Sequence, residues 1–137
     1  MPLAHHVGLT VSDRTDSLKF YRDILDFEVV NELSFEGGAF GTAVGVPDAS
    51  AEFSVLDAGE FRLELIEYQD PISHAEHPRL NQPGTNHLGI TVEDLDAFLA
   101  NVPSNVPQLS EPQVTPTGNC IVFLRDPDGN LIELLER

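Results

Sequence analysis

Basic residues are scarce in this sequence. The 137 residues include 7 Lys and Arg against 23 Asp and Glu, which gives a formal net charge of −16, and Lys19 is the single lysine. Such a surface repels nucleic acid and anionic membranes, so both are excluded as expected partners. Because salt screens this self-repulsion, the charge predicts a protein adapted to a high-salt cytoplasm. Equal stability with and without salt would contradict that prediction.

Cysteine and long apolar runs are also nearly absent. Cys120 is the only cysteine, which excludes an intrachain disulfide and a thiolate zinc cluster. Its position in the apolar run CIVFL predicts a small buried filler rather than a nucleophile. No run approaches the ~20 apolar residues of a membrane span, and the N-terminus lacks the features of a signal peptide. We expect a cytoplasmic protein.

An internal repeat organises the chain. Residues 6–11 (HVGLTV) reappear as residues 87–92 (HLGITV), and residues 63–67 (LELIE) reappear as residues 132–136 (IELLE). A length of 137 residues is typical of a single domain. We therefore predict one domain, residues 1–137, with a first module at about residues 1–70, a linker at about 71–85 and a second module at about 86–137.

Each half has the pattern strand, helix, then three strands. In the first half, strands are expected at residues 3–12, 27–35, 51–57 and 61–68, with a helix beginning near Asp13. In the second half, strands are expected at 87–92, 108–116, 119–125 and 130–136, with a helix at 94–102; prolines make the strand at 108–116 the weakest. The extra length of the first half falls at residues 37–50, which we expect to be a loop. The fold class is therefore α+β, with two βαβββ modules.

The repeat carries one histidine and one glutamate in each copy. His6 and His87 share a strand face with a glycine and a threonine, which implies a cavity above that face. Glu64 and Glu133 lie inside apolar strands, where an unpaired carboxylate is costly and is usually paired or bound to metal. A two-fold arrangement of the modules would bring these four side chains to one centre. Two imidazoles and two carboxylates suit one Zn, Ni, Co, Mn or Fe ion, and the alternative is a pair of structural His–Glu hydrogen bonds.

Several neighbouring residues compete for a role. His5 rivals His6 as a ligand but is expected to point to the opposite face. Glu67 and Glu136 also recur, and their position near strand ends predicts solvent exposure. His74 and His77 lie in the linker, where they form either a lid or exposed loop residues.

The sequence resembles the vicinal oxygen chelate superfamily, which contains glyoxalase I, methylmalonyl-CoA epimerase, extradiol dioxygenases, and fosfomycin and bleomycin resistance proteins. The resemblance covers nearly the whole chain. Its motifs are HVGLTV at 6–11, FYRDIL at 20–25, LEL at 63–65, NHLGI at 86–90 and DPDGNLIEL at 126–134. It implies paired βαβββ modules that form a curved mixed sheet around a metal.

The resemblance also implies a ligand set and a chemistry. In the glyoxalase and epimerase branch all four positions, here His6, Glu64, His87 and Glu133, supply ligands. The extradiol branch uses three, which correspond to His6, His87 and Glu133, so Glu64 favours the first branch. The implied reaction is proton abstraction beside a metal-bound carbonyl, giving an enediolate, with Glu133 as the base.

Two positions depart from the family pattern. Asp26 replaces the usual glycine after the first helix, which Asp tolerates because it accepts left-handed geometry. Asn31 stands where bacterial glyoxalases carry an arginine for the glutathione carboxylate, which disfavours glutathione as the thiol.

The resulting hypothesis is a metal-dependent isomerase, lyase or epimerase that acts on a small α-hydroxy or α-keto carbonyl compound. The alternatives are a resistance-type binding protein, an Fe(II) extradiol-type dioxygenase, and thiol transfer or epoxide opening. The family implies a homodimer, with the metal site built within one chain or across two.

Overall fold

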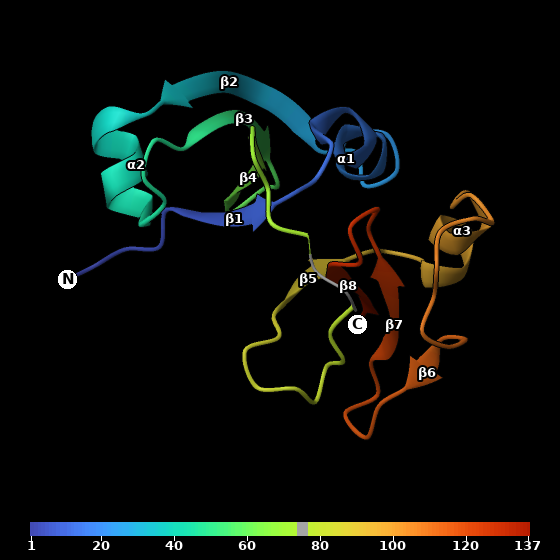
Figure 1. Cartoon of the computed structure of the whole chain (residues 1–137). Coiled ribbons are helices and arrows are strands. Elements are labelled where there is room, and N and C mark those ends of the chain that lie inside the picture. The colour runs from blue at the N-terminus through green and yellow to red at the C-terminus, as the bar shows by residue number, and fades with distance from the viewer. Residues whose placement is uncertain (74–76) are drawn as a thin grey trace. The chain divides into compact units, whose positions relative to one another are not determined.

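The structure is a computed structural model that describes residues 1–73 and 77–137. The chain divides into two compact units, Met1–Ser73 and His74–Arg137, drawn from blue to green and from yellow to red in Figure 1. None of the described helices is long and apolar enough to span a membrane. The single-domain arrangement of the two modules stays a prediction.

The two units have the same strand topology. Unit 1 contains β1 (His6–Thr10), α1 (Arg14–Tyr21), β2 (Glu28–Glu36), α2 (Gly38–Val44), β3 (Ser50–Asp57) and β4 (Arg62–Tyr68). Unit 2 contains β5 (His87–Thr91), α3 (Leu95–Ala100), β6 (Gln113–Val114), β7 (Cys120–Arg125) and β8 (Leu131–Glu136). The sheet orders are β1-β4-β3-β2 and β5-β8-β7-β6, and in each the first pair is parallel while the other pairs are antiparallel. The predicted α+β fold of two βαβββ modules is confirmed.

One face of each sheet forms the core under its helix. Leu63 and Leu65 of β4 are fully buried, and α1 packs against this strand. Ile132 and Leu134 of β8 are equally buried, with α3 against them. Each such leucine or isoleucine contributes about 1.5–3 kcal/mol through burial. Because strand side chains alternate, Glu64 and Glu133 necessarily point to the other face.

The region at 37–50 is not only a loop. Residues 38–44 form the short helix α2, and Gly45 ends it in a left-handed conformation with φ 71°. The sequence GAFGTAV has no capping side chain and two glycines, so the local pattern did not predict this helix.

Three smaller predictions also have outcomes. Asp26 adopts φ 62°, so its predicted left-handed geometry is confirmed. Only Gln113–Val114 of the weak strand forms a named strand, β6, where Pro112 and Pro116 stop its extension. Cys120 is half-buried rather than buried, because it begins its strand.

The recurring glutamates Glu67 and Glu136 are half-buried, so the prediction of solvent exposure was wrong. The Glu67 carboxylate accepts a hydrogen bond of 2.7 Å from the backbone N–H of Arg14, the first residue of α1. The Glu136 carboxylate accepts one of 2.6 Å from the backbone N–H of Leu95, the first residue of α3. Both glutamates therefore satisfy N–H groups that a helix start leaves without partners, which explains why they recur.

We predict that Glu136→Ala lowers the free energy of unfolding by about 1–3 kcal/mol, because a charged hydrogen bond at a helix N-terminus is lost. Glu136→Gln, which keeps an acceptor oxygen, should lose less. Urea unfolding in high salt measures both. Glu111→Ala, at an exposed position, is the control and should change stability by less than about 0.5 kcal/mol. An equal loss in Glu111→Ala and Glu136→Ala would contradict the assignment.

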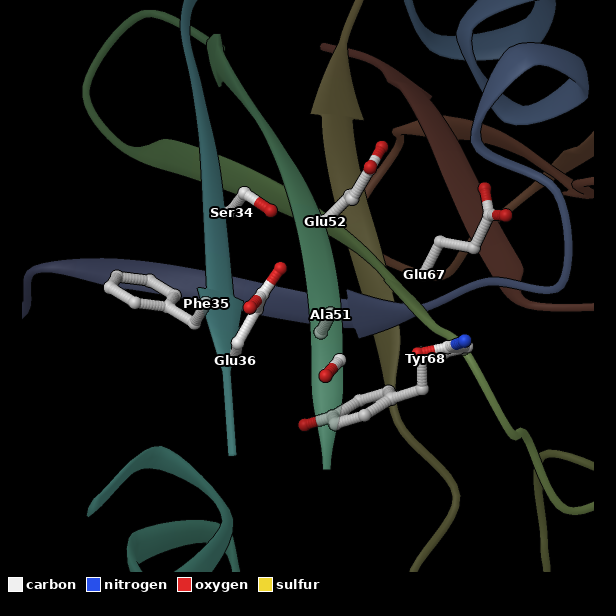
Figure 2. Close-up of a pocket in the computed structure, with 9 residues that line it drawn as sticks. Ser34, Phe35, Glu36, Ala51, Glu52, Glu67 and Tyr68 are labelled. Atoms are coloured by element: carbon white, nitrogen blue, oxygen red, sulfur yellow. The ribbon is translucent and has the colours of Figure 1, made fainter. Parts of the chain in front are cut away.

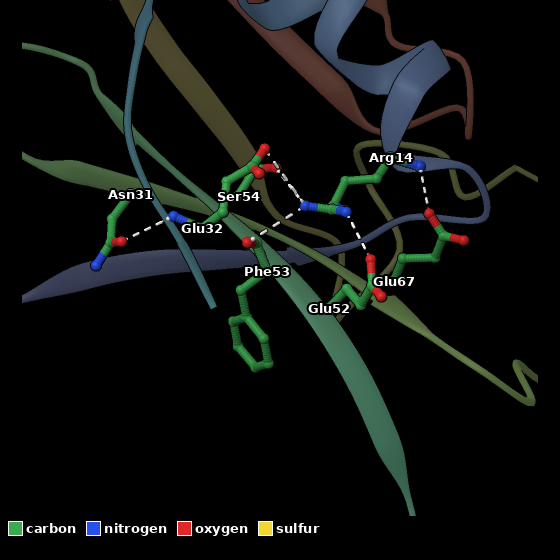
Figure 3. Close-up of polar contacts among 7 residues, drawn as sticks. All are labelled: Arg14, Asn31, Glu32, Glu52, Phe53, Ser54 and Glu67. Atoms are coloured by element: carbon green, nitrogen blue, oxygen red, sulfur yellow. Dashed lines mark hydrogen bonds and ion pairs between the residues drawn. The ribbon is translucent and has the colours of Figure 1, made fainter. Parts of the chain in front are cut away.

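Arg14 introduces a difference between the modules. Its guanidinium donates to the Ser54 hydroxyl at 2.9 Å and to the Glu52 carboxylate at 2.6 Å, while Glu32 lies 3.7 Å away (Figure 3). In unit 2 the first helix residue is Leu95, and Val122 occupies the register position of Ser54; both are buried. On the face away from Glu64, unit 1 thus has a polar network at positions that buried apolar residues occupy in unit 2.

Candidate metal centre

The structure brings His6 and Glu64 together in unit 1. Strand β1 lies parallel to β4 with Gly8 beside Glu64, and His6 precedes Gly8 by two residues on the same face. The His6 Nε2 atom lies 3.3 Å from Oε2 of Glu64. The repeat histidine and the strand glutamate of this unit therefore lie together, as both the metal site and the alternative of a structural His–Glu hydrogen bond require.

Unit 2 repeats this geometry. Strand β5 lies parallel to β8 with Gly89 beside Glu133. The His87 Nε2 atom lies 3.3 Å from Oε2 of Glu133. The repeat therefore preserves a three-dimensional pair as well as a sequence pattern.

The burial of the two pairs is also matched. The histidine side chains are 42% and 41% exposed, whereas the glutamate side chains are 16% and 21% exposed. Each carboxylate is held near the sheet, while each imidazole remains open on one side. Such a pair offers one nitrogen and one oxygen to a ligand that approaches from the face opposite the helix.

The two glycines of the repeat allow close packing at the pairs. A Cβ atom at Gly89 would lie 3.7 Å from Oε2 of Glu133, and one at Gly8 would lie 3.2 Å from Cδ1 of Ile66. The sequence suggested that Gly8 leaves space above the sheet. In the structure Gly8 also accommodates the side chain of Ile66.

The histidine rings have different neighbours. Nδ1 of His6 shares a hydrogen bond of 2.8 Å with Nδ1 of His5, while the His87 ring packs edge-on against Phe123 at 5.2 Å between centroids. His5 thus contacts His6, and His6 is the residue that meets Glu64. Sequence alone did not reveal these contacts, because they depend on side-chain conformations.

The Nε2–Oε2 distance within each pair fits two ligands of one metal ion. Two ligand atoms about 2.1 Å from one metal, at an angle of about 90–110°, lie about 3.0–3.4 Å from each other. Both Nε2–Oε2 distances of 3.3 Å fall in this range. Within either unit, the described residues form no group of three or more His, Cys, Asp or Glu suited to a metal. The convergence of the two pairs on one ion stays a prediction.

A protein-family model shows which superfamily the chain belongs to. The model of the Glyoxalase/Bleomycin resistance protein/Dioxygenase superfamily matches residues 3–134. The chain belongs to this superfamily.

Relatives within the superfamily have different activities. A 2-epi-5-epi-valiolone epimerase from Actinomyces sp is 30% identical over 142 residues, which cover 96% of this chain and 77% of that protein. Glyoxalase I of Saccharomyces cerevisiae is 26% identical over 139 residues, which cover 96% of this chain and 42% of that protein. A glyoxalase family protein from Bacillus cereus has the same fold, with a TM-score of 0.84, 21% identity and coverage of 97% of this chain and 92% of that one.

Asn31 occupies the position at which the resemblance to bacterial glyoxalases implied an arginine. Asn31 lies in register with Val55, which in turn lies beside Glu64, so the three share a face. Its side-chain oxygen accepts a hydrogen bond of 2.9 Å from the N–H of Glu32. The side chain is therefore engaged with its own strand, and it provides no positive charge beside the His–Glu pair.

The linker histidines differ in what the structure describes. His74 lies outside the described residues. His77 is exposed, and its ring packs over Gly129 in the β7–β8 turn, where it occupies the space of a Cβ. Residues 126–129 form the turn between β7 and β8, with Gly129 at φ 82° and a hydrogen bond from its N–H to the carbonyl of Asp126.

A shallow pocket of about 390 Å³ lies elsewhere in unit 1, at the ends of β2, β3 and β4 (Figure 2). Its lining includes Glu36, Glu52 and Glu67 but neither His6 nor Glu64. Glu52 and Glu67 already bind Arg14. This pocket is therefore not the predicted cavity above the His–Glu face.

Proposed function

We propose that the chain binds one divalent metal ion through His6, Glu64, His87 and Glu133. The observation that carries the proposal is the duplicated pair, with Nε2–Oε2 distances of 3.3 Å in both units. Two ligands alone hold a metal weakly, whereas two such pairs supply the four nitrogen and oxygen ligands that Zn, Ni, Co, Mn or Fe accept.

We further propose that the protein is an isomerase, lyase or epimerase for a small α-hydroxy or α-keto carbonyl compound. The glyoxalase I and epimerase relatives support this class of reaction. A bound divalent metal would supply Lewis-acid stabilisation of negative charge on a carbonyl oxygen. The presence of Glu64 beside His6 favours this four-ligand chemistry over the three-ligand dioxygenase type.

The chain's own residues would then move a proton. Glu133, which would have to release the metal to act as a base, is proposed to take the proton from the carbon next to the carbonyl, becoming a neutral carboxylic acid. It would return that proton to the same carbon in an epimerisation or to the neighbouring carbon in an isomerisation. The partly exposed imidazoles leave room for a substrate on this face.

Deuterium exchange tests the proposal. Hydroxyacetone and related α-hydroxy ketones in D₂O should exchange the protons next to the carbonyl faster with metal-loaded protein than with chelator-treated protein, as followed by proton NMR. No acceleration with any of Zn, Ni, Co, Mn or Fe would contradict it. Oxygen uptake with catechols under Fe(II) would instead favour the dioxygenase alternative.

We also propose that two chains associate into a homodimer, as the resemblance implies. Light scattering coupled to gel filtration in high salt should give about twice the mass of one chain. A single-chain mass would contradict dimerisation without affecting the ligand assignment.

A further inference from the structure

Aromatic side chains share a sheet face with the His6–Glu64 pair. In the register of unit 1, Val55 lies beside Glu64, Phe53 beside Ile66, and Ala51 beside Tyr68. Strand β2 adds Leu33 beside Phe53 and Phe35 beside Ala51. Because register partners point to the same side, Phe35, Phe53 and Tyr68 lie on the face of Glu64. Figure 3 shows the Phe53 ring directed away from Arg14, which lies on the opposite side.

Helix α2 adds a fourth ring to this face. The Phe40 ring stacks on Phe35 at 5.4 Å and on Tyr68 at 6.2 Å between centroids. The Phe53 ring meets Phe35 edge-on at 5.2 Å and Phe40 at 6.0 Å. We call these four residues the aromatic cluster. Unit 2 has no named helix at the corresponding point, so within the described chain the cluster belongs to module 1.

The cluster has an open side. Phe53 is buried, but Phe35 is 44% exposed and the adjacent Leu33 is 37% exposed. A contiguous exposed apolar surface beside polar, metal-suited residues is typical of a small-molecule site. The cluster is therefore better placed to bind a ligand than to complete the core.

The spacing suits a small substrate. Residues along a strand rise about 3.4 Å each, so Phe53 lies about 7 Å and Phe35 about 14 Å along the strands from the level of Glu64. A substrate with its carbonyl group at the His6–Glu64 pair would therefore extend an attached ring or short chain across Val55 to this cluster.

The charge of this sheet face indicates which kind of substrate group the aromatic cluster would bind. Among the strand residues of this face in unit 1, the one cationic side chain is Arg62, which pairs with Asp57 at 3.0 Å. No unpaired positive charge is therefore available there for a carboxylate or phosphate. We propose that the aromatic cluster binds an uncharged apolar or aromatic group of the substrate, while the oxygen atoms of the same substrate lie at the His–Glu pair. This inference rests on the proposed metal function.

Two chelators of different size test the inference. Acetohydroxamate and benzohydroxamate present the same two oxygens to a metal but carry a methyl or a phenyl group. Metal-loaded wild-type protein should bind benzohydroxamate at least about 10-fold more tightly, as measured by calorimetry in high salt, because the ring gains aromatic contacts. Phe35→Ala should reduce this preference to about 3-fold or less and leave acetohydroxamate binding unchanged.

Matched variants separate ring contact from misfolding. Phe35→Leu keeps apolar volume without the ring and should lose part of the preference. Val44→Ala, at an exposed α2 position outside the cluster, should keep all of it. Circular dichroism checks that each variant is folded.

The inference is overturned if wild-type protein binds both chelators equally, or if Phe35→Ala keeps the full preference for benzohydroxamate. In either case the proposed metal site stands. Failure of both chelators to bind metal-treated protein overturns the proposed function itself.

Discussion

Replacing Glu64 or Glu133 with alanine should weaken divalent metal binding at least about 100-fold. Each replacement removes one proposed oxygen ligand and leaves the paired histidine, 3.3 Å from that oxygen in the wild type, as the single proposed ligand in its unit. Even partners that only orient metal ligands cost about 10- to 100-fold when removed, so a lost ligand should cost at least as much. Competition with a fluorescent metal indicator measures the affinity.

Glu28→Ala provides the matched control for these two variants. Glu28 is an exposed glutamate at the start of β2, and its loss changes the net charge equally. Its metal affinity should equal that of wild type. Loss of affinity in Glu133→Ala but not in Glu64→Ala would indicate the three-ligand dioxygenase arrangement instead.

Glu133→Gln should slow proton exchange in α-hydroxy ketones by about 10²- to 10⁴-fold, the usual contribution of a positioned general base. Glutamine keeps an oxygen near His87 but cannot accept the proton. Proton NMR in D₂O, under metal concentrations that saturate the variant, measures the rate.

Glu64→Gln makes the corresponding change in the other pair, which has nearly the same geometry and burial. It should slow exchange much less if Glu133 is the base. A larger loss in Glu64→Gln would assign the base to unit 1, and an unchanged rate in both would contradict carboxylate catalysis.

Much of the fold was predictable because the chain repeats itself. The copies of HVGLTV and of LELIE predicted two matching strands in each half, and the structure has these strands as neighbours, β1 beside β4 and β5 beside β8. Strand alternation then predicted that His6 and His87 share a strand face with a glycine and a threonine, away from the apolar side chains between them. These predictions succeeded because apolar periodicity determines which strand face is buried.

Contacts between distant residues were not predictable. Glu67 and Glu136 appeared exposed because a strand pattern does not reveal a helix start above it. Helix α2 was missed because residues 38–44 have neither a cap nor an apolar stripe of helical period, and the aromatic cluster was missed with it. Tertiary packing of Phe40 on Phe35 and Tyr68 accompanies that helix.

The central claim is that the two His–Glu pairs serve one ion. The most direct test is metal analysis of purified wild-type protein, dialysed in high salt against excess Zn, Ni, Co, Mn or Fe(II). The four-ligand account predicts one tightly bound metal per chain. Two metals per chain would mean that each pair binds separately, and none would mean that the pairs are only structural hydrogen bonds; either result would contradict the account.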